Sequence, residues 1–155
     1  MRVSRLLFLI LMGLAIVGGQ AASAQDKLEE TLSSFGYVIK KSDSVDPNAW
    51  EKERYQTLAK RVIKIRSTKA VPGWSDAFYR FTVVEERYAD SRNAEMRLSR
   101  LLEEPPDMVR PEDQKAFPLR TGFQYGKGVY VVSTDVEMFE GEMKRIAKEL
   151  KESFR

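Results

Sequence analysis

Residues 117–133, FPLRTGFQYGKGVYVVS, decide the predicted fold because they describe a β-hairpin in one continuous stretch. Every second residue from Phe117 to Tyr125 is apolar or threonine, which is the pattern of a strand with one buried face. Gly126, Lys127 and Gly128 supply a turn, and residues 129–133 read as the partner strand.

The segments on either side of this hairpin predict helices and one further strand. Downstream, Thr134 and Glu137 have the spacing of a capping box. They precede apolar residues spaced by three and four: Val136, Phe139, Met143, Ile146, Leu150 and Phe154. Upstream, residues 79–83 alternate like a strand that ends in charged residues, and Asp90 or Ser91 caps a helix that ends before Pro105. The C-terminal half therefore predicts strand, helix, hairpin and helix.

The N-terminal half predicts more helix than strand. Residues 26–35 have helical spacing and Gly36 follows as a left-handed stop, after which residues 37–39 predict a brief strand. Asp46 as N-cap and Pro47 at the first helical position predict a second helix, which runs into an extended piece near Lys64. The fold class is thus α+β: a small antiparallel sheet of about three to four strands with helices packed on one face, plus an N-terminal helical region.

Residues 1–24 have the pattern of a cleaved secretory signal peptide. Arg2 and Arg5 precede an apolar run from Leu6 to Val17, and small residues lead to a cleavage site after Ala24. The run is shorter than the roughly 20 residues that a helix needs to span a bilayer. We therefore expect a single α+β domain over residues 25–155, periplasmic or secreted, with no stable transmembrane anchor after cleavage. An uncleaved N-terminal anchor is the alternative.

Composition excludes several classes of function. The mature chain would hold 24 basic and 23 acidic residues, so the excess of positive charge falls to +1 and gives no reason to expect nucleic acid binding. Cysteine and histidine are absent, which excludes disulfides, thiol catalysis, histidine-based triads and the commonest metal sites. We expect no metal and no cofactor. The absence of cysteine and of glycosylation sequons favours a bacterial envelope protein.

The strongest charge concentration lies between residues 52 and 69. Lys60, Arg61 and Lys64 belong to it and would lie on the predicted second helix, where they could bind an anionic ligand. A solvated helix face is the simpler interpretation, and the acidic segment 103–113 is a possible partner within the chain. Trp74 is a further candidate binding residue, either as an exposed stacking ring or as a plug at the end of the sheet.

No residue pattern nominates a catalytic site. Glu85 and Glu86 would point to opposite faces of a strand and are expected to be solvated, while Glu103 and Glu104 precede a double proline. The sequence therefore predicts an exported, non-enzymatic binding or interaction protein whose partner is an envelope protein, a polymer or a small ligand. A sheet face left uncovered by helices or the basic second helix would carry the site. The alternative is a small hydrolase using carboxylate or Ser/Lys chemistry.

Overall fold

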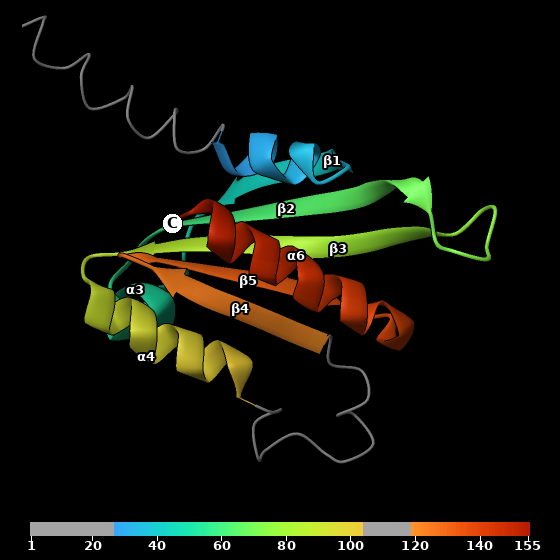
Figure 1. Ribbon diagram of the computed structural model, residues 1–155. Helices are drawn as coiled ribbons and strands as arrows, with labels where there is room; N and C mark the ends of the chain where they lie inside the picture. The colour runs from blue at the N-terminus through green and yellow to red at the C-terminus, as the bar shows by residue number, and fades with distance from the viewer. Residues whose placement is uncertain (1–26, 104–118) are drawn as a thin grey trace, which may run out of the picture.

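The computed structural model describes residues 27–103 and 119–155, which form a five-stranded antiparallel sheet with helices against both faces (Figure 1). The strands are β1 (Tyr37–Val45), β2 (Thr57–Ala70), β3 (Phe78–Tyr88), β4 (Leu119–Tyr125) and β5 (Gly128–Thr134). The helices are one over residues 27–34, α3 (Ala49–Tyr55), α4 (Ser91–Leu102), the 3-10 helix η1 (Glu137–Phe139) and α6 (Glu140–Ser153). The strand order in the sheet is β1-β2-β3-β5-β4. The class is α+β, as predicted, with one strand more than the upper expectation.

The first face of the sheet carries the larger core. Odd-numbered positions of β2 and β3 point to it, so Ile63 pairs with Val83 and Ile65 with Phe81. The helix over residues 27–34 and α6 cover this face with their apolar residues, which are Leu28, Leu32, Met143, Ile146, Ala147 and Leu150. The spacing predicted for the C-terminal helix is thus the spacing that packs it.

Among the described residues, helices cover the second face at one end only. Tyr55 of α3 and Ala94 of α4 pack there against Tyr88, Val129 and Val131. The prediction that helices pack on one face is therefore wrong. Both faces are covered at this end because β5 is apolar at successive positions, which suits a strand buried on both sides.

The predicted second helix is short, and this is the main correction to the sequence analysis. Asn48, not Asp46, caps α3 and forms a capping box with Glu51, while Gln56 ends the helix in a left-handed conformation at φ 53°. The segment from Thr57 to Ala70 is strand β2. Its β-branched residues favour a strand, and β2 pairs with β1 on one side and β3 on the other.

Several local signals are confirmed. Gly36 follows the first helix at φ +86°, Gly126 lies in the β4–β5 turn at φ +57°, and the Asp90 side chain caps α4. The capping box predicted at Thr134 and Glu137 does not form, because the chain first makes η1 and α6 begins without a side-chain cap. The signal peptide, Phe117 and the acidic segment from residue 104 onward lie outside the described residues.

Gly122 in β4 gives a first testable prediction. A Cβ at this position would lie 2.5 Å from the backbone oxygen of Tyr130, and backbone cannot move as a flexible side chain can. We expect Gly122→Ala to lower the free energy of unfolding by about 1–3 kcal/mol in urea titration. Gly141→Ala is the control, because a Cβ there meets nothing within 4 Å and helical alanine is favoured by about 0.5–1 kcal/mol. Equal stability of the two variants would contradict the close approach at Gly122.

Candidate functional site

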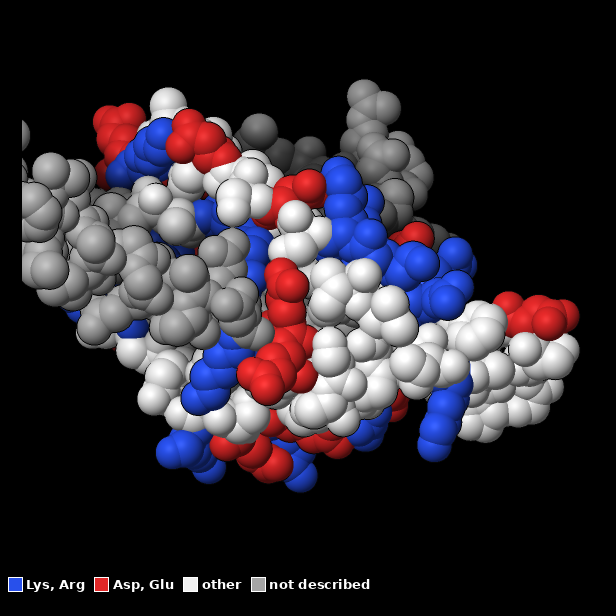
Figure 2. All heavy atoms as spheres, turned by 90° about the horizontal axis from the view of Figure 1, so that it is seen from above, with Lys and Arg blue, Asp and Glu red and all other residues white. Residues whose placement is uncertain are grey.

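The part of the second sheet face that α3 and α4 leave uncovered carries cations from four strands. One row of cross-strand neighbours runs through Lys64, Thr82, Ser133 and Arg120. We call this surface the basic face, and its cations are Lys40, Lys64, Arg66, Arg80 and Arg120. In Figure 2, Lys and Arg side chains gather in one group at the upper right. A shallow hollow of about 570 Å³ lies within this surface and is lined by all these cations except Arg120, together with Asp135.

Cations of the basic face lie opposite other cations on neighbouring strands. Arg66 of β2 lies directly opposite Arg80 of β3. Lys64 lies opposite Lys41 of β1, which is not one of these five cations and forms an ion pair with Asp43. Like charges at directly opposed positions destabilise a sheet, since their side chains are close neighbours. In the described part of the chain, Lys64, Arg66 and Arg80 form no ion pair. Within the described residues, the positive charge of these three side chains therefore has no ion-pair partner.

The structure separates the residues predicted to form one basic patch. Lys60 points to the second face, where its Nζ lies 2.7 Å from Glu51 Oε1 and 3.2 Å from Glu86 Oε1. Arg61 points to the first face and is buried against Glu85, with Nη2 2.8 Å from Oε2. Of the three, only Lys64 is exposed on the basic face. The helical prediction failed here because neighbours on a strand alternate between faces.

Trp74 is exposed, which decides between the two positions expected for it. Its side chain is 60% exposed in the β2–β3 hairpin, so it does not plug the end of the sheet. Its backbone N–H donates to the carbonyl of Val71 and closes the turn. The β2–β3 hairpin lies beyond the cross-strand pair of Arg66 and Arg80. Trp74 therefore lies past that end of the basic face.

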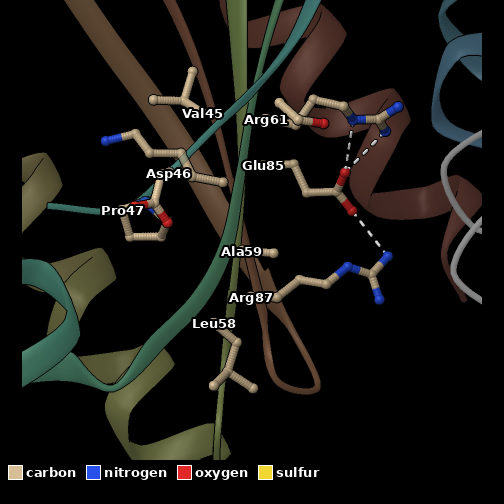
Figure 3. A pocket seen from close by; sticks show the side chains of 10 residues that line it. Val45, Asp46, Pro47, Leu58, Ala59, Arg61, Glu85 and Arg87 are labelled. Atoms are coloured by element: carbon tan, nitrogen blue, oxygen red, sulfur yellow. Dashed lines mark hydrogen bonds and ion pairs between the residues drawn. The ribbon is translucent and has the colours of Figure 1, made fainter.

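Glu85 lies in a second cluster, on the first face (Figure 3). Arg61 Nε donates to Glu85 Oε2 at 3.0 Å, and Arg87 Nη2 lies 3.0 Å from Oε1. These residues line a hollow of about 380 Å³ at the end of β1 and the start of β2. Burial and the nearby charge of Glu85 raise the pKa of Tyr130, whose hydroxyl faces the same carboxylate, to about 12.

A third cluster is buried under α3 and α4 on the second face. Arg97 of α4 donates from Nη2 to Glu51 Oε1 and from Nε to Glu86 Oε2, each at 3.1 Å, and Lys60 reaches both carboxylates. The Tyr88 hydroxyl also donates to Glu86. The guanidinium of Arg97 lies over the Tyr55 ring at 5.2 Å. We call Glu51, Lys60, Glu86 and Arg97 the buried charge cluster.

Both clusters correct the expectation that Glu85 and Glu86 are solvated. The two side chains do point to opposite faces, as predicted, but they are 5% and 1% exposed. Sequence reasoning missed their partners because Arg61, Lys60 and Arg97 come from other segments of the chain. Their burial could have been inferred from their positions in the strand: Glu86 shares a strand face with Tyr88, and Glu85 shares the opposite face with Val83.

The electrostatics of the buried charge cluster favour the ionised form of Glu51. Burial opposes ionisation of Glu51, but hydrogen bonds from Lys60 and from the Asn48 backbone outweigh it and hold the Glu51 pKa below its ordinary value. A general acid at neutral pH needs a carboxyl whose pKa is raised. Within residues 27–103 and 119–155, no group of three acidic residues could hold a metal ion.

Comparison of the chain with protein-family models, with curated proteins and with solved structures gives no match. In the part of the chain that the structure describes, no helix has both the length and the apolar character needed to cross a membrane.

Arg97 tests the buried charge cluster. Replacement by alanine leaves Glu51 and Glu86 with Lys60 as their remaining cation in the cluster, so we expect Arg97→Ala to lower the free energy of unfolding by about 3–5 kcal/mol in urea. Arg100→Ala on the same helix removes an exposed pair with Glu103 and should cost at most about 1 kcal/mol. A similar loss in both variants would show that the cluster adds nothing to what a surface pair provides.

Glu51 also predicts a dependence of stability on pH. Its folded pKa is lower than the ordinary value of about 4.3, so its ionised form stabilises the fold above that pH, and the contribution is lost as the pH falls through the folded pKa. Between about pH 5 and pH 3, the free energy of unfolding should fall less steeply in Glu51→Gln than in the wild type. Glu53→Gln, which changes an exposed residue of α3, should follow the wild type. Identical slopes for all three proteins would exclude a contribution from Glu51.

Proposed function

We propose that this protein is an exported, non-enzymatic binding protein that holds an anionic partner of the cell envelope on the basic face. The observation that carries the proposal is the pair of directly opposed arginines, Arg66 and Arg80, beside Lys64 in an open hollow. An arrangement that destabilises the sheet is explained if a ligand supplies the missing negative charge. The site is the uncovered sheet face, one of the two locations suggested by the sequence.

Export supports an envelope partner over an intracellular one. It rests on the pattern of residues 1–24, which lie outside the described residues. A surface that gathers several cations without an ion-pair partner among the described residues attracts anions locally, even in a protein of nearly balanced charge. Anionic polymers or headgroups of the envelope fit this distribution better than nucleic acid does, given the expected compartment.

A carboxylate-based hydrolase is less well supported. Each of the carboxylates of Glu51, Glu85 and Glu86 pairs with two cationic side chains, so their charges are compensated within the protein. A hydrolase would need one of these carboxyls to be protonated and facing a substrate. In the part of the chain that the structure describes, the cations of the basic face have no such partner, and this contrast favours binding.

The basic face can be tested on a heparin column with a matched control. The protein is the exported form, whose N-terminus by mass spectrometry should be Gln25. We expect Lys64→Ala, Arg66→Ala and Arg80→Ala together to shift elution to lower salt, because fewer cations release fewer counter-ions. The control replaces Lys144, Lys148 and Lys151 on α6, which removes the same charge from exposed positions on the other side of the sheet. It should elute close to the wild type.

Two results would contradict the proposal. Equal shifts of the two triple variants would mean that net charge alone sets retention. Unchanged retention of the Lys64, Arg66 and Arg80 variant would remove the basic face from consideration. Lys60 and Arg61 are unsuitable for this test because both are held in ion pairs, and replacing them would disturb the fold.

A further inference from the structure

Arg66 differs from the other cations of the basic face in how it is held. Its guanidinium lies over the Phe78 ring at 4.9 Å, which limits the directions it can take. Its Nε is buried and has no hydrogen-bond partner in the described part of the chain. Buried nitrogen donors are nearly always paired, so this one calls for an acceptor beyond those that residues 27–103 and 119–155 provide. Nε and the adjacent Nη of arginine together form the fork that binds two oxygens of one anion.

The surroundings of this fork suit one anion with several oxygens. Arg80 lies directly across from Arg66, and Lys64 is two residues away on the same strand face. Cross-strand neighbours have Cβ atoms about 4.5–5.5 Å apart, within the reach of two arginine side chains that converge on one group. Thr82 lies opposite Lys64 and adds a hydroxyl to the lining of the same hollow.

We propose that Arg66 and Arg80 form a binding site for a phosphate group carried by the ligand of the basic face. This inference rests on the proposed function and names its ligand chemistry. A carboxylate has two oxygens in one plane and one negative charge, and a single fork can contact both oxygens. A phosphate has further oxygens and up to two negative charges, so it can use Arg66 through the fork and still accept from Arg80 and Lys64.

The test separates fork geometry from charge. Arg66→Lys keeps the positive charge but removes the Nε–Nη fork. Inorganic phosphate is titrated into each protein, with acetate as the comparison anion, and the Nε–H resonances of arginine are followed by NMR. In the wild type, phosphate should shift the Arg66 resonance and bind at least about tenfold more tightly than acetate. In Arg66→Lys this preference should fall to about twofold, while elution from heparin stays near that of the wild type.

Controls keep the outcome interpretable. Arg92→Lys makes the same chemical change at an exposed position of α4 and should keep the phosphate preference. Arg80→Lys gives a second probe of the site if Arg66→Lys unfolds, and it should weaken phosphate binding while retaining heparin binding. Vesicles containing phosphatidylglycerol distinguish a lipid headgroup from a free phosphate as the ligand. Sedimentation of the protein with these vesicles, reversed by inorganic phosphate, identifies a headgroup. Binding of inorganic phosphate without such sedimentation identifies a free phosphate.

Clear results would overturn the inference. If phosphate leaves the Arg66 Nε–H resonance unmoved, or if Arg66→Lys binds phosphate as tightly as the wild type does, the fork site is wrong. The proposed function fails separately, when the Lys64, Arg66 and Arg80 triple variant elutes from heparin like its α6 control.

Discussion

Glu85 and Glu86 are adjacent on β3, and the ion pairs they form on opposite faces of the sheet orient the layers around them. Glu86 on the second face binds Arg97 of α4 and Lys60 of β2. Glu85 on the first face binds Arg61, whose guanidinium also reaches Glu29 in the helix over residues 27–34. Buried ion pairs contribute little net stability, because desolvation offsets much of the attraction. Their effect is on geometry, since a helix in a different position would leave a buried charge unpaired.

The position of the basic face follows from this geometry. The buried charge cluster holds α3 and α4 at one end of the second face, where Tyr88, Val129 and Val131 provide apolar contacts. Beyond Val62 and Val84, which lie opposite each other, the next cross-strand pairs on this face are Lys64 with Thr82 and Arg66 with Arg80, and none of these residues belongs to the apolar cluster under α3 and α4. The same strands β2 and β3 therefore carry ion-paired charge under the helices and, beyond them, charge without an ion-pair partner among the described residues. This difference separates the structural ion pairs from the proposed binding surface.

Local signals predicted much of the fold. The β4–β5 hairpin, the strand through Phe81, the Asp90 cap and the spacing of α6 are all visible in short windows, because each depends on neighbours in sequence. The error at β2 has the same origin. The apolar residues keep a helical spacing from Trp50 to Ile65, but the helix ends at Gln56, where the chain takes a left-handed conformation. The stretch that follows becomes a strand because β1 and β3 offer backbone partners on both sides, and no short window contains them.

The sequence by itself determined the α+β class, the faces to which Glu85 and Glu86 point, and the concentration of positive charge in the segment that contains Lys60 and Lys64. Only the tertiary structure decided which of these charges are compensated. Lys60 and Arg61 have partners from other segments, whereas Lys64 lies beside Arg66 and Arg80 on an open surface. The reason is physical: alternation along a strand is a local property, but the counter-ion of a side chain is set by which distant segment packs against it. The tertiary structure therefore moves the candidate site from a predicted helix to one face of the sheet.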